Sequence, residues 1–251
     1  MKEISEIIKF PFGVCSFSLL KDSLINCRNI NRIPNNAQSV IIVAFPYKVK
    51  EEKPLNISRY AAVCDYHTVV EKYLEAFVKS LLEKYPNNKF VCFTDNSPIP
   101  EVYAGAVSGL GVKGKNGLLI TKEYGSFVFL GEIVTDLYIE SENRYSECIN
   151  CGVCLKICPV HLNKEKCLSA VTQKKKDLNA EEQRLIRDNG SIWGCDICAE
   201  ICPMNRDKGL SDIKEFINSY RNEYVLGEKS EDRAYNWRGE EVIKRNFSLS
   251  E

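Results

Sequence analysis

The stretch Cys148-Ile-Asn-Cys151-Gly-Val-Cys154-Leu-Lys-Ile-Cys158-Pro159 carries four closely spaced cysteines and decides the character of the second half of the chain. A second run, Cys195-Asp-Ile-Cys198-Ala-Glu-Ile-Cys202-Pro203, ends in the same way but lacks a cysteine at its front. Cys167 lies between the two runs and can fill that place. Most of the 12 cysteines therefore fall in one segment, in a pattern that indicates metal binding.

The first run matches the C-x2-C-x2-C-x3-C-P spacing of bacterial ferredoxins that hold two [4Fe–4S] clusters. There, three thiolates of a run bind one cluster and the fourth binds the other. Crossing the fourth ligands in this way predicts one cluster on Cys148, Cys151, Cys154 and Cys202, and another on Cys158, Cys167, Cys195 and Cys198. Structural zinc is the alternative, because paired C-x2-C knuckles also suit a tetrahedral ion. The Cys-Pro endings favour the clusters.

Composition narrows the class of protein. Lysine plus arginine and aspartate plus glutamate both number 34, so the net charge is zero and a wholly basic nucleic-acid binder is not expected. The longest apolar runs are too short to span a bilayer, and the first residues lack the apolar stretch of a signal peptide. We expect a cytoplasmic protein, in which thiols stay reduced. The remaining cysteines lie in or beside apolar sequence and are expected to be packing residues: Cys15, Cys27, Cys64 and Cys92.

The first 145 residues alternate strand-like and helix-like patterns. Ser39 to Phe45 is apolar and largely β-branched, which predicts a buried strand. From Asp65 to about Lys84 the apolar residues recur at helical spacing, and Pro86 ends the pattern. The residues that form this stripe are Val70, Tyr73, Leu74, Phe77, Leu81 and Leu82. A second strand is expected over 89–95, and it places Asp95 at the start of a loop. The sequence further predicts a short helix over 101–108, a glycine-rich turn over 109–117, and strands over 118–121 and 126–137.

Around residue 146 the composition changes from strand-like runs to crowded cysteines and charge. The predicted α+β organisation is a mixed α/β sheet domain over 1–145, a ferredoxin-like double-cluster domain over 146–206, and a helical extension over 207–251. The segment Gly109-Leu-Gly111-Val-Lys-Gly114 fits the spacing of a dinucleotide-binding loop. It follows a helical segment rather than a strand, so dinucleotide binding is not expected.

Further motifs follow in order along the chain, from about residue 25 to the C-terminus. They are Ile57-Ser-Arg-Tyr-Ala with Asp65-Tyr-His67, Thr94-Asp-Asn-Ser-Pro98 with Glu101, Gly109-Leu-Gly with Gly114-Lys-Asn116, Glu123-Tyr-Gly-Ser126 with Gly131-Glu132, Lys166-Cys-Leu-Ser169, Gly194-Cys-Asp-Ile-Cys198 with Cys202-Pro-Met-Asn205, and Trp237-Arg-Gly239 with Arg245-Asn246. Together with the cysteine runs, this set resembles the epoxyqueuosine reductase family. The related reductive dehalogenases match the Asp95 and Lys115-Asn116 segments less well.

The resemblance implies reductive removal of the epoxide oxygen of epoxyqueuosine in the tRNA anticodon loop, which gives queuosine. It also implies a base-off cobalamin between the sheet domain and the ferredoxin-like domain, reduced to nucleophilic cob(I)alamin through the two clusters. By position, Asp95 is then the proton donor, and burial beside an apolar corrin would raise its pKa as an acid catalyst requires. The implied cobalamin contacts are Ser58, Asp95, Ile120, Thr121, Leu130, Ser169, Asp196 and Ile197.

The chain holds only two histidines, His67 and His161. A histidine that binds a metal usually has a partner for its other ring nitrogen, and the sequence shows no such pair. This agrees with a cobalamin whose cobalt is not coordinated by a histidine of the protein, and His67 is expected to be structural.

Two departures from the family bear on the substrate. The loop between Cys158 and Cys167 is shorter than in full-length members, and the helical-repeat domain that helps hold tRNA in longer members is not seen after Arg245-Asn246. Lys174-Lys-Lys176 is the best local candidate for phosphate binding, although a solvated loop explains it equally well. A cobalamin-dependent reductase of a small molecule and an iron–sulfur electron-transfer protein without cobalamin therefore stay open. The expected partners are tRNA and a flavodoxin- or ferredoxin-type electron donor, and the chain is expected to be a monomer.

Overall fold

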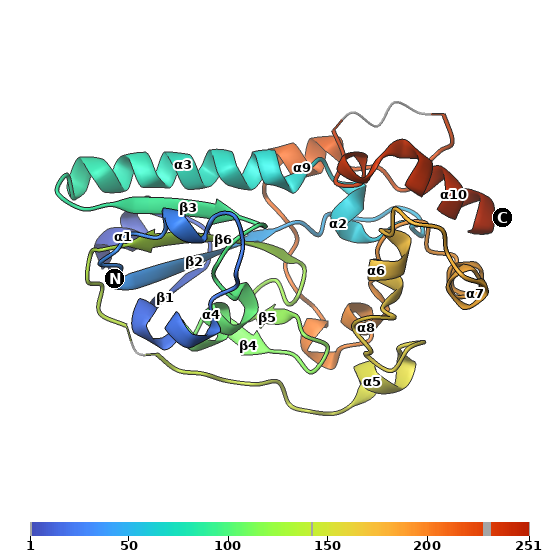
Figure 1. Ribbon diagram of the computed structural model, residues 1–251, viewed down its shortest axis with the longest axis horizontal. Helices are drawn as coiled ribbons and strands as arrows, with labels where there is room; N and C mark the ends of the chain where they lie inside the picture. The colour runs from blue at the N-terminus through green and yellow to red at the C-terminus, as the bar shows by residue number, and fades with distance from the viewer. Residues whose placement is uncertain (1, 142, 228–231, 251) are drawn as a thin grey trace. The chain divides into compact units, whose positions relative to one another are not determined.

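A computed structural model describes residues 2–141, 143–227 and 232–250. It divides into two compact units, the first formed by Met1–Pro46 with His67–Asn150 and the second by Tyr47–Tyr66 with Cys151–Glu251. In chain order (Figure 1) the helices and strands are α1 Lys2–Ile7, β1 Phe12–Ser16, η1 Phe17–Leu19, η2 Lys21–Ser23, η3 Ile30–Arg32, β2 Ser39–Pro46, α2 Arg59–Ala62, α3 Tyr66–Lys84, β3 Phe90–Thr94, α4 Glu101–Val107, β4 Gly111–Lys113, β5 Leu119–Thr121, β6 Val128–Thr135, α5 Val153–Ile157, α6 Leu168–Thr172, α7 Ala180–Asn189, α8 Ile197–Glu200, η4 Pro203–Asn205, α9 Lys214–Ser219, η5 Asn236–Arg238 and α10 Glu240–Ser250.

A four-stranded sheet forms the centre of the first unit, with the strand order β1-β2-β6-β3. Every neighbouring pair is antiparallel, which confirms the predicted α+β fold class. The central strand β2 is buried at every residue, as its unbroken apolar run predicts. Its neighbour β6 is buried along nearly its whole length, although it carries Glu132 in the middle. A separate hairpin pairs β4 with β5.

Helices cover both faces of this sheet (Figure 1). On one face α3 approaches so closely that a Cβ on Gly131 would lie 2.8 Å from Leu74 Cδ1 and 3.0 Å from Val70 Cγ1. On the other face the sheet packs against α4 and β5. A single buried apolar cluster joins these elements, and it includes Ile42, Phe93, Ala104, Val107, Leu119, Leu130 and Val134.

Residues 47–66 help to build the core of the second unit. The Ser58 N–H donates to the Trp193 carbonyl at 2.7 Å, and Ile57 forms a parallel bridge with the same residue. Trp193 is fully buried. Its apolar cluster comprises Ile57, Ala61, Ala62, Ile192, Tyr224, Tyr235, Val242 and Ile243. The segment that precedes α3 in sequence therefore depends for its burial on residues near the C-terminus.

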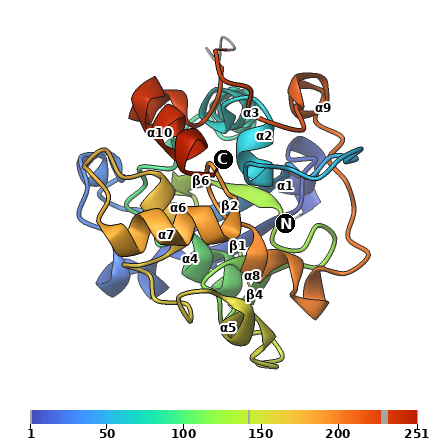
Figure 2. The ribbon, with the colours of Figure 1, turned by 90° about the vertical axis from the view of Figure 1, so that its right-hand side faces the viewer.

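The helices α6, α7 and α10 contact one another in the second unit (Figure 2). The helix α7 begins at a capping box, in which the Asn179 side chain accepts the Glu182 N–H and the Glu182 side chain accepts the Asn179 N–H. It ends at Gly190, which adopts a left-handed conformation with φ of 62°. These local signals fix a helix whose only fully buried apolar residue is Ile186.

The structure divides the chain differently from the predicted boundaries at 145 and 206. Residues 47–66 group with the second unit, and residues after 206 share its core rather than forming a separate extension. The reason is long-range pairing, exemplified by Ser58 with Trp193, which composition along the chain does not reveal.

Most predicted elements of the first unit are confirmed, namely the strands near 39–45, 89–95, 118–121 and 126–137 and the helices near 65–84 and 101–108. Two short strands were missed: β1, which is only five residues long, and β4, which lies inside the predicted glycine-rich turn. Leu82 is wrongly placed in the buried stripe of α3, because it is 40% exposed. Among the described residues, no helix has both the length and the apolar character needed to cross a bilayer.

Candidate functional site

Asp95 is the first residue after β3 and has a left-handed backbone, with φ of 57°. Aspartate tolerates this conformation better than most residues, so the turn is compatible with the side chain. The Asp95 carbonyl accepts the N–H of Ser97, and Ser97 Oγ in turn accepts the Ile99 N–H at 3.1 Å. The Asp95 side chain is 56% exposed. The sheet end therefore presents a carboxyl group to solvent from a turn that is held by hydrogen bonds.

His67 supplies a partner for this carboxyl group. Its Nε2 atom lies 3.2 Å from Asp95 Oδ2, and its side chain is 31% exposed. The expectation that His67 lacks a partner is therefore corrected, whereas its structural role stays a prediction. The sequence could not predict this contact, because His67 near the start of α3 and Asp95 after β3 are distant in sequence and come together only in the tertiary fold. An imidazole in contact with a carboxyl group can hold or exchange a proton near neutral pH.

Two further carboxyl groups lie behind Asp95. Burial raises the pKa of Glu101 from its ordinary value of 4.5 to about 8, and the negative charge of Asp95 adds to the rise. Burial likewise raises the pKa of Glu132 well above 4.5, with further contributions from Glu101 and Asp95. A glutamate inside an apolar strand is the sequence signal that could have singled out Glu132 as an acid.

The other predicted cobalamin contacts of the first unit are buried residues of the same sheet and of the hairpin. Leu130 pairs with Ala44 on β2 and belongs to the apolar cluster beneath α4. Ile120 lies in β5, and the neighbouring Thr121 donates its hydroxyl to the Gly125 carbonyl at 3.0 Å. These side chains are thus positioned by regular structure rather than by a free loop.

In the second unit the structure brings Ser58 and Ser169 around the half-buried residue Tyr60. Gln173 Nε2 donates to the Tyr60 hydroxyl at 3.2 Å and to Ser169 Oγ at 3.3 Å. Gly194 approaches so closely that a Cβ there would lie 2.0 Å from Ser58 Oγ, and its φ of 73° also favours glycine. Ser58 Oγ and Trp193 Nε1 lie near the Tyr60 hydroxyl, yet neither makes a hydrogen bond of ordinary geometry.

Asp196 and Ile197 follow directly after this glycine turn. Asp196 Oδ2 accepts the backbone N–H of Arg59 at 2.7 Å and lies 3.4 Å from Arg59 Nη1. The same guanidinium group also pairs with Glu51 and Glu200. Burial raises the pKa of Asp196 to about 6, and the contact with Arg59 limits the rise. Four predicted contacts, Ser58, Ser169, Asp196 and Ile197, therefore belong to one neighbourhood of the second unit.

The eight cysteines predicted to bind the clusters, those of the two runs and Cys167, form no disulfide. Cys148 belongs to the first unit, where its Sγ accepts the Lys115 N–H at 3.4 Å, and the other seven belong to the second. The helices α5 and α8, which carry Cys154 and Cys198, contact each other. Among the residues described, no three His, Cys, Asp or Glu side chains surround a point where one ion could bind.

Comparison with known proteins finds a matching family model for a segment of the sheet domain and another for the cysteine-rich segment. Residues 28–96 match the family model described as "Epoxyqueuosine reductase QueG, DUF1730", and residues 147–205 match that of a 4Fe-4S double cluster binding domain. The epoxyqueuosine reductase of Synechocystis is 36% identical over 207 residues, which make up 75% of this chain and 70% of that protein. The chain belongs to the epoxyqueuosine reductase family. The predicted family and the predicted pair of [4Fe–4S] clusters are thereby confirmed, whereas the assignment of individual ligands stays a prediction.

Solved structures of the epoxyqueuosine reductase family have the same fold. The enzyme from Streptococcus thermophilus matches with a TM-score of 0.82 and 27% identity, over 99% of this chain and 80% of that one. An epoxyqueuosine reductase crystallised with an epoxyqueuosine-modified tRNA-Tyr stem loop matches with a TM-score of 0.83 and 22% identity, over 99% and 79% of the two chains. The chain spans 60–62% of the length of other curated relatives, such as those of Listeria monocytogenes and Gloeobacter violaceus.

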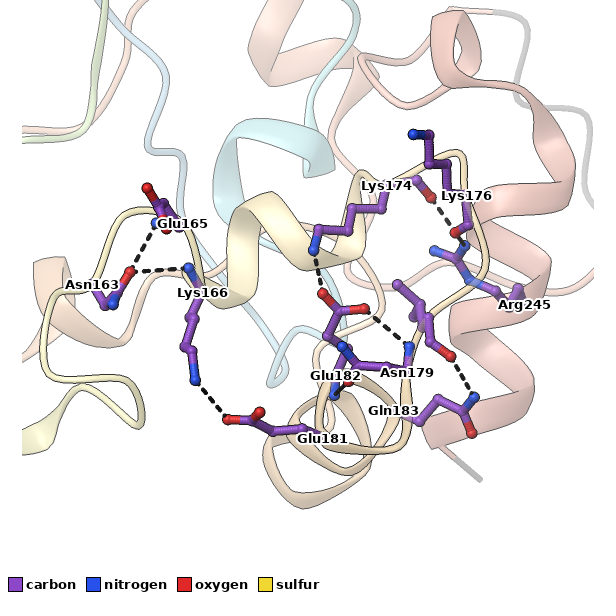
Figure 3. A network of polar contacts seen from close by, with 11 residues as sticks. Asn163, Glu165, Lys166, Lys174, Lys176, Asn179, Glu181, Glu182, Gln183 and Arg245 are labelled. Atoms are coloured by element: carbon purple, nitrogen blue, oxygen red, sulfur yellow. Dashed lines mark hydrogen bonds and ion pairs between the residues drawn. The ribbon is translucent and has the colours of Figure 1, made fainter.

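The lysine segment that sequence singled out for phosphate binding is partly engaged within the unit (Figure 3). Lys174 Nζ pairs with Glu182. Arg245, one of the family-like residues near the C-terminus, donates from Nη1 to the carbonyls of Lys174 and Lys176 at 2.9 and 3.0 Å. The backbone of this turn is therefore fixed, and Lys175 and Lys176 carry its exposed positive charge.

The four cysteines that are not predicted cluster ligands differ in burial. Cys15 and Cys64 are buried, and Cys27 and Cys92 are half-buried. Burial raises the pKa of Cys15 to about 12, and it raises the pKa of Cys64 and of Cys92 as well. A buried thiol with a raised pKa is chemically inert, which agrees with the packing role predicted for these residues.

Proposed function

We propose that this chain removes the epoxide oxygen of epoxyqueuosine in tRNA and so forms queuosine. The observation that carries the proposal is the presence, in one chain of this family, of the double-cluster domain and of the exposed Asp95 carboxyl group next to His67. The crystallised relative with a modified tRNA stem loop supports tRNA as the substrate.

The reaction converts an epoxide into an alkene and water, and it consumes two electrons and two protons. Iron–sulfur clusters are one-electron carriers, so two of them suit the stepwise delivery of the electrons. The oxygen leaves as water only if an acid protonates it. We assign this step to Asp95, because its carboxyl group is exposed at the sheet end while its backbone is held in a fixed turn.

The cluster ligands follow from the crossed pattern of bacterial ferredoxins. Cys148, Cys151, Cys154 and Cys202 would bind one cluster, and Cys158, Cys167, Cys195 and Cys198 the other. Contact between α5 and α8 supports the crossing, because it brings the two cysteine-bearing helices side by side.

We also propose that the chain binds cobalamin in its base-off form. The second unit has polar groups that could bind the polar edge of this cofactor. Ser58 Oγ and Trp193 Nε1 are buried and make no hydrogen bond among the described residues, and Gly194 next to Ser58 has no side chain that would cover Ser58. Ser58, Ser169, Asp196 and Ile197 are the corrin contacts that we propose in this unit. Asp95, Ile120, Thr121 and Leu130, which belong to the first unit, stay contacts implied by the family resemblance. When bound, the cofactor would supply a nucleophilic, strongly reducing cobalt.

The proposal is tested by anaerobic reconstitution with iron, sulfide and cobalamin, followed by assay on tRNA that carries epoxyqueuosine. We expect about eight irons per chain, as two cubanes require, a base-off cobalamin signal in electron paramagnetic resonance, and formation of queuosine. Eight irons without cobalamin binding would instead favour an electron-transfer protein. Bound cobalamin without any tRNA binding, in a gel-shift titration at low salt, would favour reduction of a small molecule.

For the partners, we propose a flavodoxin- or ferredoxin-type electron donor, a monomeric state and a cytoplasmic location. The likeness to bacterial epoxyqueuosine reductases supports the last of these. Mass photometry and reduction assays with each donor class would test the others.

A further inference from the structure

Glu132 is a carboxyl group in the buried interior of the first unit. It is in the middle of β6, opposite Ile42 on β2 and Phe93 on β3. It is 0% exposed, and among the described residues neither of its carboxyl oxygens has a hydrogen-bond partner. A carboxylate in such a place has lost its hydration without compensation, so the protonated form is strongly favoured.

The alternation of side chains along β6 shows which face Glu132 occupies. The neighbouring Gly131 faces α3, because a Cβ there would meet Leu74 and Val70. Glu132 therefore faces the opposite side of the sheet. Leu130 and Val134, which share that side, belong to the apolar cluster that packs against α4.

Glu101 and Asp95 lie at the same face and the same end of the sheet. Glu101 is the first residue of α4, whose Ala104 and Val107 belong to that cluster. Asp95 follows β3, whose Phe93 is the direct ladder partner of Glu132. The three carboxyl groups interact electrostatically with one another. They form a series from the buried Glu132 through the half-buried Glu101 to the exposed Asp95.

Other titratable or charged groups are few on this face. His67 contacts the outer member of the series, at Asp95. The guanidinium carbon of Arg32 lies 5.0 Å from the centre of the Phe93 ring. The thiol of Cys15 and the hydroxyl of Tyr103 belong to or border the apolar cluster. None of these groups is among the main influences on the pKa of Glu132. Burial and the other two carboxyl groups raise that pKa, and the side chain of Ser97 lowers it.

The proposed reaction needs two protons for each oxygen removed, and Asp95 carries one. We propose that Glu101 and Glu132 form a proton reservoir that reloads Asp95 during the reaction. The Asp95 O–H gives its proton to the leaving oxygen and becomes a carboxylate. The Glu101 O–H then protonates that carboxylate, Glu132 reprotonates Glu101, and the second proton leaves through Asp95 to complete water. Solvent restores the protons, and the electrons come through the clusters from a one-electron donor.

The catalytic role of this reservoir rests on the proposed function. The protonation of Glu101 and Glu132 does not, so it can be measured independently of activity. Infrared spectroscopy of the reconstituted protein at pH 7 detects the C=O stretch of protonated carboxyl groups without any turnover. We expect such a band in the wild-type protein, its reduction in Glu132→Gln and Glu101→Gln, and its retention in Glu75→Gln. Glu75 is the matched control, because it is an exposed glutamate of α3 in the same unit. Absence of the band in the wild-type protein would overturn the reservoir even if the enzyme is active.

Kinetics test the role of the stored protons. In multiple-turnover assays we expect Glu101→Gln and Glu132→Gln to lower kcat about tenfold or more, as loss of a proton-transfer group does, with KM for tRNA unchanged. Wild-type kcat should fall as pH rises above about 8, where Glu101 loses its proton, and this limb should be absent in Glu101→Gln. Unchanged kcat and pH profile in both variants would overturn the role. A wild-type protein that shows the infrared band but never reduces epoxyqueuosine would refute the proposed function and leave the reservoir standing.

Should Glu132→Gln fail to fold, the wild-type protein alone still provides a test. The C=O band should then persist from pH 6 to 8 and diminish only at higher pH. A band that disappears near pH 5, as for an ordinary carboxyl group, would contradict the reservoir.

Discussion

Buried charge is handled in opposite ways in the two units. In the second unit Asp196, whose side chain is only 14% exposed, accepts the Arg59 N–H and lies beside a guanidinium group that also pairs with Glu51 and Glu200. In the first unit Glu132 is fully buried, its carboxyl oxygens have no hydrogen-bond partner among the described residues, and two more carboxyl groups lie nearby. A counter-charge stabilises the ionised form of a buried acid, whereas burial without a counter-charge favours the protonated form. The comparison therefore separates a structural cluster from a chemical one.

Replacement of the outermost acid should have the largest effect. Asp95→Asn keeps the shape of the side chain but removes its acidic proton, so we expect kcat to fall by about 10² to 10⁴-fold, the range found for a general acid. Iron and cobalamin contents should be unchanged, as measured by metal analysis and electron paramagnetic resonance. Asp22→Asn is the control, because Asp22 is an exposed carboxylate of the same unit. Full activity of Asp95→Asn would show that the acid lies elsewhere.

Loss of the cation in the paired cluster should mainly cost stability. Arg59→Met leaves Asp196 buried beside Glu51 and without its counter-charge. Removing one partner of a buried ion pair typically costs about 3–5 kcal/mol. Urea unfolding followed by tryptophan fluorescence reports this unit, because both tryptophans, Trp193 and Trp237, lie in it.

Arg187→Met, a change at an exposed arginine of α7, provides the control for that measurement. If the two variants unfold at the same urea concentration, the Arg59 cluster is not a stabilising feature and the contrast between the units fails.

The unpaired acids should make the stability of the first unit depend on pH. Above pH 4.5 an unfolded Glu132 loses its proton while the folded one keeps it, so rising pH favours the unfolded chain. The loss is about 1.4 kcal/mol per pH unit for each such group. It continues for Glu101 until about pH 8, its folded pKa. Glu132→Gln should therefore lose less stability than the wild type between pH 5 and 8.

Urea unfolding followed by pulse labelling of Cys15 reports the first unit, because this thiol is fully buried in β1. Glu75→Gln should keep the wild-type dependence on pH. Parallel curves for Glu132→Gln and the wild type would mean that Glu132 is already ionised in the folded protein.

The same distinction explains what the sequence could and could not predict. The strand around Val40–Phe45, the helix ending before Pro86 and both cysteine runs depend on local spacing, and all were predictable. Asp95 was predictable as an acid only through the family motif. Its contact with His67, and the burial of Glu132 next to Glu101, depend on which ends of distant elements meet in the fold. The same holds for residues 47–66, whose core partner Trp193 is far away in the sequence.

The smallest effect is expected for an ion pair at the surface of the second unit. Lys174 is half-exposed and pairs with Glu182 at the start of α7 (Figure 3). This contact lowers the pKa of Glu182, so the pair stabilises the fold above pH 4.5 and loses its effect as pH falls through the lowered pKa. Exposed pairs contribute about 1 kcal/mol or less. Lys174→Met should therefore cost little stability at pH 7 and none at strongly acidic pH, as measured by tryptophan fluorescence in urea. A loss as large as that of Arg59→Met would show that burial does not set the strength of charge pairing in this unit.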